Sequence, residues 1–300
     1  MTAAREPGSP GEPGSPGEPP LTSELVRLLG AIALSPPPAS DVLCDAAGLP
    51  CISGADHTAA FVLLAPPYAA IHLGAEGKLG GEGRDRVEGF WRALGQPVPD
   101  DADHLGVLLM CYAGLRELSP GIPAAARAAH TLFHEHIWPF APGYLCAAEA
   151  LGIGSVSAWA RLALAVLRAE LDELPAPADH ATLPLALREA PAPLTLSASF
   201  DEVLDAAVTP ARSGMILTQR ELAAGAAELG IGYRRGERRY ALRAMIEQDK
   251  AATLSWLGNC AASWADRHTA AYGGTASGQW WSRRARHSSE ILATMAGAVQ

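Results

Sequence analysis

The sequence predicts an all-α fold, and three features of the chain indicate it. Alanine and leucine dominate, whereas β-branched residues are sparse and never alternate over the length of a strand. Apolar positions instead recur at helical spacing, and glycine and proline separate the stretches in which they do so. A hydrophobic content of 49% is enough for a substantial core, and 300 residues allow one large or two ordinary domains.

Four parts are expected along the chain. Residues 1–20 repeat glycine and proline with collagen's period, but four triplets are too few for a triple helix, so a disordered tail is expected. Residues 21–174 are predicted to form a helical domain. The stretch 175–198 is rich in proline and alanine and is expected to be a linker, with one short helix near 183–189. Residues 199–300 are predicted to form a basic helical C-terminal region.

Helical spacing, caps and stops justify each element of the first helical part in turn. Ser23 or Thr22 is expected to cap the first helix, Asp56 the third and Ser155 the last. Pro66-Pro67 must end the third helix, because proline lacks an N–H and disfavours the α conformation at the preceding residue. The predicted helices cover residues 23–35, 41–47, 56–64, 82–94, 104–119, 124–138, 143–150 and 155–174.

In the C-terminal region, Thr218 and Glu221 form a capping box ahead of an apolar helix that Gly230 should end. The predicted helices there cover residues 200–207, 219–229, 238–248, 251–268 and about 278–300.

The stretch from Val98 to Pro142 is the centre of the predicted domain. Asp100, Asp101 and Asp103 stand where a helix N-terminus favours carboxylates and side-chain caps, so Asp103-His104 is a polar pair that opens an apolar helix. A short proline and glycine connection leads into the next helix. We therefore expect two antiparallel helices that share a core.

Charge is distributed unevenly within the overall net charge of -9. Residues 21–210 carry 22 acidic and 10 basic side chains, whereas residues 211–300 carry 7 acidic and 12 basic ones. One interpretation is that the two parts attract each other or are simply solvated. The other is that the acidic part receives a cationic partner.

Several classes of protein are disfavoured by what the sequence lacks. The five cysteines are scattered and form no C-x-x-C pair, which argues against a disulfide framework or a zinc ribbon. No apolar run approaches the ~20 residues of a membrane span, and no secretion signal is recognised, so a cytoplasmic protein without membrane insertion is expected.

The sequence lacks part of the motif that a metal site, a nucleotide-binding loop or a hydrolase active site would require. His130 and His134 are one helical turn apart, but the order of residues departs from H-E-x-x-H and His136 points to another side, so no metal site is predicted. The glycine-rich loop at 74–81 lacks the Ser or Thr of a P-loop. No G-x-S-x-G motif accompanies Asp103-His104, so no catalytic residue and no cofactor are predicted.

A nucleic-acid-binding regulator is the main alternative. Residues 217–243 suggest a helix-turn-helix whose arginines, from Arg234 to Arg243, would contact phosphates. The connection around 229–237 is longer than the tight turn of that motif, and the acidic part of the chain would repel DNA. Both features argue against it.

In residues 21–174 the sequence resembles the TorD/DmsD/NarJ family of maturation chaperones for molybdenum-containing oxidoreductases. Its motifs occur in the family's order: Pro66-Pro67-Tyr68 with Gly77-Lys78-Leu79-Gly80-Gly81, then Phe90-Trp91-Arg92-Ala93-Leu94-Gly95, then Pro99 ahead of Asp103-His104-Leu105, then His134 ahead of Trp138-Pro139-Phe140. Two departures occur: the family's E-P-x-D-H is interrupted here, and Leu108 replaces the glutamate usual four residues after the histidine. The basic C-terminal region lies outside the shared part.

The resemblance implies a TorD-like helical bundle and a non-enzymatic chaperone. Such a protein binds the apoprotein of its client oxidoreductase, through a twin-arginine signal peptide, until the molybdopterin cofactor is inserted. Family members are monomers or domain-swapped homodimers, and a monomer is the default expectation. The resemblance places the peptide groove at Tyr68, Trp91, Asp103, His104 and Leu105.

The missing glutamate implies that the charge-matching role shifts to Asp100 and Asp101. The chemistry of the peptide agrees, because an arginine pair ahead of an apolar run needs carboxylates beside an apolar groove.

Overall fold

The computed structural model describes residues 21–175 and 183–298. Within these ranges it confirms the all-α prediction: helices make up the structure, and the one β-type pairing is an isolated bridge between Tyr68 and His104. The predicted tail at 1–20 and part of the predicted linker lie outside the described residues.

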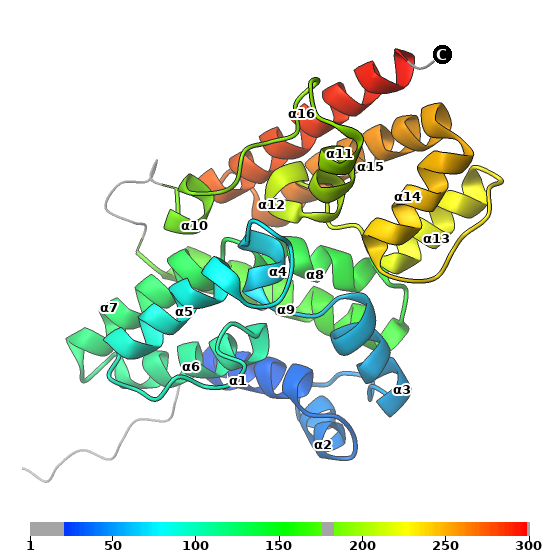
Figure 1. Cartoon of the computed structure of the whole chain (residues 1–300). Helices are drawn as coiled ribbons and strands as arrows, with labels where there is room; N and C mark the ends of the chain where they lie inside the picture. The colour runs from blue at the N-terminus through cyan, green and yellow to red at the C-terminus, as the bar shows by residue number, and fades with distance from the viewer. Residues whose placement is uncertain (1–20, 176–182, 299–300) are drawn as a thin grey trace, which may run out of the picture.

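Helices of the first part, to residue 174, pack in a bundle (Figure 1). They are α1 (Leu21–Leu34), α2 (Ala39–Ala46), α3 (Gly54–His57), η1 (Thr58–Leu64), α4 (Ala69–Leu73), α5 (Gly81–Ala93), α6 (Leu105–Leu118), α7 (Pro123–Thr131), η2 (Leu132–Ile137), α8 (Ala141–Ala150) and α9 (Gly154–Glu173). The segments η1 and η2 are π-helices, a form found mostly as short segments and often near functional sites.

The second part contains two long helices that form a hairpin and several shorter ones. They are α10 (Leu185–Arg188), α11 (Phe200–Val208), α12 (Pro210–Ser213), α13 (Gln219–Glu228), α14 (Arg238–Gln248), α15 (Lys250–Tyr272) and α16 (Ala276–Gly297). In Figure 1, α8 and α9 lie between the N-terminal helices and the α15–α16 hairpin, and α8 contacts α15 directly.

Two glycines allow α1 and α6 to pack at unusually short range. A Cβ added to Gly30 would lie 2.7 Å from the carbonyl oxygen of Gly106, and one added to Gly106 would lie 2.6 Å from that of Gly30. The indole N–H of Trp159 on α9 donates to the Leu29 carbonyl at 3.0 Å. The predicted pair of helices also shares this core, since the rings of Tyr112 and Phe133 are 5.4 Å apart.

Buried apolar side chains form two clusters, one mainly in residues 26–187 and one mainly in residues 194–296. Tyr272 and Trp281, from the α15–α16 hairpin, belong to the first cluster, and both donate to the carbonyl of Pro139, at 3.0 and 2.7 Å. These aromatic residues attach the hairpin to the first part. The predicted domain boundaries themselves stay a prediction.

Several predicted caps are wrong in detail. Ser53 caps α3, since its Oγ accepts from Asp56 N, whereas Asp56 was expected in that role. Ser155 lies inside the first turn of α9, whose N-cap is Ile153. The capping box of Thr218 and Glu221 is confirmed.

Candidate functional site

The predicted groove residues meet where the segment before α4 runs beside the start of α6. Pro66-Pro67 ends η1 and continues as extended chain, as the missing N–H groups of proline require. Ala69 N donates to the Asp103 carbonyl at 3.0 Å, and Leu105 N donates to the Pro67 carbonyl at 2.7 Å. We call this pairing of residues 67–70 with residues 103–106 the α4–α6 junction.

Asp103 caps a helix other than the one the sequence suggested. Its Oδ2 accepts from Ala70 N at 2.9 Å, so the carboxylate caps the first turn of α4, 33 residues away in sequence. The side chain is only 2% exposed, and burial raises its pKa, while the hydrogen bond from Ala70 opposes that shift. The hydrogen bond from Ala70 N to Asp103 therefore connects α4 to the start of α6.

His104 is the N-cap of α6. Its Nδ1 accepts from Gly106 N at 3.0 Å, which places the ring proton on Nε2, and its ring meets that of Tyr68 edge-on at 5.0 Å. Burial lowers its pKa to about 4, so the ring is neutral at pH 7. Histidine is a rare helix cap compared with Asp. No local sequence pattern indicates that Asp103 caps α4 and His104 caps α6.

The remaining predicted residues surround this buried pair. Leu105 is fully buried, whereas Asp100 and Asp101 are exposed. The Tyr68 hydroxyl donates to Asp101 Oδ1 at 3.0 Å, and burial together with Asp101 raises the pKa of Tyr68 to about 12. Trp91 is half-buried, and its indole N–H donates to the Ala102 carbonyl at 3.3 Å.

The structure thus brings the predicted residues into one neighbourhood with two layers. Asp103, His104 and Leu105 are buried and their polar atoms are occupied by the backbone. Tyr68, Trp91, Asp100 and Asp101 form the accessible layer, which we call the junction surface.

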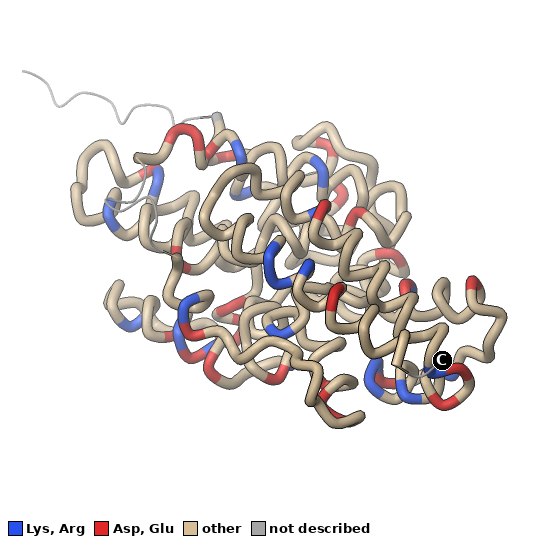
Figure 2. The backbone as a smooth tube through the Cα atoms, turned by 90° about the horizontal axis from the view of Figure 1, so that it is seen from above, with Lys and Arg blue, Asp and Glu red and all other residues tan. Residues whose placement is uncertain are grey.

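Three of the five arginines of the alternative helix-turn-helix are engaged within the chain, whereas Arg234 and Arg235 are exposed and form no ion pair within the described residues. Arg238 donates to the Leu217 carbonyl at 3.0 Å, and Arg239 and Arg243 both pair with Asp201 on α11. Arg239 also pairs with Asp205. Figure 2 shows basic and acidic segments interspersed over the chain as a whole.

Other sites considered from sequence are not assembled within the described residues. The rings of His130 and His134 are 4.4 Å apart, but His136 packs against Phe90 instead, and no group of three or more His, Cys, Asp or Glu in the described ranges could hold a metal ion. None of the described helices combines the length and hydropathy of a membrane span.

Sequence reasoning missed one feature entirely, a cavity of about 900 Å³ beside η2. Its lining comes from α7, η2, α9, the residue before α10 and the α15–α16 connection. Because these segments are far apart in sequence, no local motif marks the cavity.

Residues 54–145 match a family model described as nitrate reductase delta subunit. This range contains the whole α4–α6 junction together with η2 and the Trp138-Pro139-Phe140 segment. No curated protein and no solved structure matches the chain significantly. Over residues 54–145 the chain is therefore similar to the nitrate reductase delta subunit family of NarJ/TorD-type chaperones.

Proposed function

We propose that this protein is a cytoplasmic chaperone that binds the apoprotein of a molybdopterin-containing oxidoreductase through its twin-arginine signal peptide. It holds the client until the cofactor is inserted, and it acts by binding rather than by catalysis. The observation that carries the proposal is that the family match spans the α4–α6 junction, where two exposed carboxylates stand beside aromatic side chains.

The junction surface has the chemistry that such a peptide needs. Asp100 and Asp101 are exposed and take part in no ion pair within the described residues, so both carboxylates are accessible to arginine. Tyr68 and Trp91 present aromatic surface next to them, and Leu94 and Val98 are partly buried apolar neighbours of the core. Charge-assisted hydrogen bonds to arginine are stronger than neutral ones, and the apolar part of the peptide needs such a surface.

Asp103 and His104 contribute indirectly in this proposal. Both are buried, both accept backbone N–H groups, and His104 is neutral. They fix the position of α4 against α6 and so determine where Tyr68 and Asp101 stand. Their substitution is expected to weaken peptide binding by moving the junction surface, not by removing a contact.

A tagged full-length chain, expressed in cells and isolated with its bound partners, tests the proposal. The expected partner, identified by mass spectrometry, is a molybdenum-containing oxidoreductase lacking its cofactor. Deleting the twin-arginine segment from that client should abolish its capture. Capture that is unaffected by this deletion contradicts the peptide-binding part of the proposal, and recovery of nucleic acid in place of a protein contradicts the whole.

A further inference from the structure

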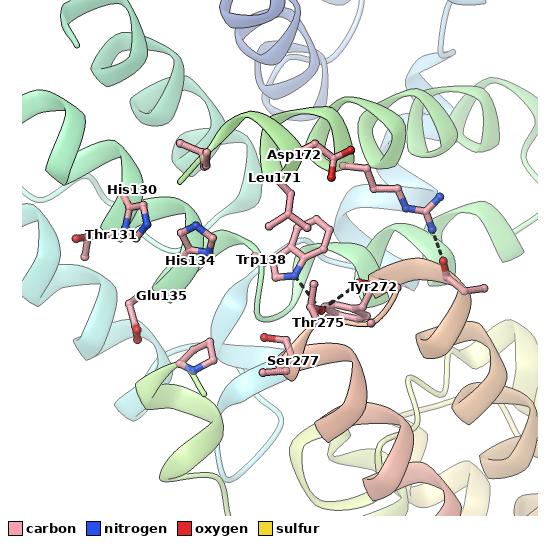
Figure 3. Close-up of a pocket in the computed structure, with 17 residues that line it drawn as sticks. His130, Thr131, His134, Glu135, Trp138, Leu171, Asp172, Tyr272, Thr275 and Ser277 are labelled. Atoms are coloured by element: carbon pink, nitrogen blue, oxygen red, sulfur yellow. Dashed lines mark hydrogen bonds between the residues drawn. The ribbon is translucent and has the colours of Figure 1, made fainter. Parts of the chain in front are cut away.

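The short helix α10 begins at the edge of the cavity beside η2. Pro184, the residue before α10, lines this cavity together with Trp138 of the first part and Ser277 of α16. Figure 3 shows Glu135 of η2 among the lining residues, and its Oε2 accepts from Leu185 N, the first N–H of α10, at 2.8 Å. The chain therefore covers this side of η2 with a segment of its own.

Two polar contacts and a small apolar patch attach α10 to α5 and η2. The hydrogen bond to Glu135 is the first contact, and the pairing of Arg86 on α5 with Glu189, the C-cap of α10, at 3.3 Å is the second. Ala186 and Leu187 lie between these contacts, are 5% and 2% exposed, and belong to the apolar cluster of the first part. We call the surface of α5 and η2 that is covered in this way the α10 site.

The chain that follows α10 is attached to the hairpin instead. Arg284 on α16 donates to the Pro191 carbonyl at 2.8 Å, and His287 Nε2 donates to the Leu194 carbonyl at 2.8 Å. Leu194 itself is buried in the second apolar cluster. Residues 183–194, which we call the strap, therefore contact the first part at one end and the second part at the other.

The attachment of α10 is weak compared with that of the hairpin. A single turn of four residues is far shorter than the roughly 12 residues at which an isolated helix becomes even marginally stable in water. The Arg86–Glu189 ion pair is partly exposed, so it adds little stability, and Leu185 is 41% exposed. The hairpin, by contrast, is attached through the buried side chains of Tyr272 and Trp281. Release of α10 therefore does not require the hairpin to leave the first part.

The α10 site lies within the range that matches the family model, whereas α10 lies outside it. Residues 54–145 include both Arg86 and Glu135. The ring of His136 on η2 packs against Phe90 on α5 at 5.3 Å, so the two helices meet beside this site. Without α10, the site would present a guanidinium, a carboxylate and the apolar surface between them to solvent.

We propose that α10 is an autoinhibitory contact, which covers a polypeptide-binding surface on α5 and η2 that a partner reaches by displacing it. The partner is a polypeptide with the chemistry of α10: a helical turn whose first N–H reaches Glu135, two apolar residues, and a carboxylate for Arg86. The arginine pair of a signal peptide would meet Arg86 instead, so this surface is distinct from the junction surface. The proposal therefore goes beyond the proposed function and does not rest on it.

The test uses the full chain and a fluorescein-labelled peptide of residues 183–194, whose binding is measured by fluorescence anisotropy. In the parent protein the strap competes at high effective concentration, so the peptide should bind weakly. Leu187→Asp in the protein places a charge in the apolar patch and releases α10, but it leaves every residue of the α10 site unchanged. This variant should bind the labelled peptide at least tenfold more tightly than the parent does.

Two controls locate the binding at the α10 site. A labelled peptide that itself carries Leu187→Asp should not bind the released protein. Leu196→Asp, the same substitution at an exposed leucine beyond the strap, should leave peptide binding at the level of the parent. Hydrogen exchange of residues 185–190, followed by mass spectrometry, reports release of α10 independently of the peptide.

A second variant, Glu189→Arg, keeps the apolar patch and replaces the attraction to Arg86 with repulsion, so it tests the proposal even if Leu187→Asp fails to fold. Faster exchange of residues 185–190 together with tighter peptide binding is the expected result. Faster exchange without a gain in peptide binding overturns the proposal, because the uncovered surface then binds no polypeptide. Unchanged exchange in the folded variants also overturns it, because α10 is then not displaceable.

Discussion

The junction surface and the arginine cluster of α14 lie in parts of the chain with opposite net charge. They differ in whether their charged side chains are paired within the fold. Asp100 and Asp101 are exposed and form no ion pair within the described residues. Arg239 and Arg243, by contrast, are paired with carboxylates of α11. Net charge along a sequence therefore does not show which charges a partner can reach, because pairing within the fold decides it.

The two parts also differ in how they use aromatic residues. The junction places Tyr68 and Trp91 at a partly open surface, whereas Tyr272 and Trp281 of the hairpin are buried against the first part. Tyr272 and Trp281 thus connect the hairpin to the first part, whereas the aromatic residues of the junction remain partly accessible. Four predictions test this difference, in order of decreasing effect.

Trp281→Ala should have the largest effect on stability. The side chain is 2% exposed, stacks on His268 at 5.3 Å and donates to the Pro139 carbonyl at 2.7 Å. Removing a buried tryptophan typically costs about 3–5 kcal/mol. Urea unfolding should show that loss, with the smaller loss in Trp281→Phe as control. A loss below about 1 kcal/mol would mean that the hairpin is not held by this residue.

Acid should destabilise the protein mainly through its buried histidines. Burial lowers the pKa of His72 to about 3 and the pKa of His104, His136 and His268 to about 4, from an ordinary value of 6.5. Below pH 6.5 these histidines bind protons in the unfolded chain but stay neutral in the folded chain until the pH approaches 4. Stability should therefore fall as the pH drops from about 6.5 towards 4.

Three of these four histidines lie in the first part of the chain, so that part should lose stability first. Urea unfolding at a series of pH values measures the slope, and His72→Phe should make it shallower. A slope identical to that of the parent protein would show that His72 does not contribute to acid unfolding.

Asp103→Ala should have an intermediate effect. The substitution removes the cap of α4, and a lost helix cap costs about 1 kcal/mol. Asp103→Asn keeps an oxygen acceptor for Ala70 N and should cost less. Thermal unfolding of the two variants gives the comparison. Equal losses would indicate that the charge of Asp103, rather than its hydrogen bond, stabilises the junction.

Asp201→Asn combined with Asp205→Asn should change stability least, by under about 1 kcal/mol, because these ion pairs are partly exposed. The substitutions release Arg239 and Arg243, so weak, salt-sensitive duplex binding should appear at low ionic strength. Gel-shift titration measures it. Equal duplex binding before and after the substitutions would mean that pairing does not mask the arginines.

Local patterns predicted the helices well, because period and punctuation depend on neighbouring residues. The Thr218–Glu221 capping box and the helix over 238–248 have the predicted form. Contacts between residues that are far apart in the sequence were not predictable in the same way. Asp103 was assigned to the helix that follows it, whereas its partner is the N–H of Ala70, which the chain brings near only after folding.

The resemblance located the junction, but it did not indicate which of its residues are accessible. Burial of Asp103 and His104 depends on the packing of α4 against α6, which no single segment specifies. The cavity at Trp138 and Ser277 was not predictable for the same reason, since its walls meet only when the C-terminal hairpin docks on the first part.

The most direct test of the central claim is a calorimetric titration of the full chain with a twin-arginine signal peptide, repeated with Asp100→Asn and Asp101→Asn combined. The control variant, Glu24→Gln with Asp266→Asn, removes the same charge from exposed positions elsewhere. We expect binding that weakens with salt, falls at least tenfold in the Asp100/Asp101 variant and is unchanged in the control. Equal affinity of all three proteins for the peptide would contradict the assignment of peptide binding to the junction surface.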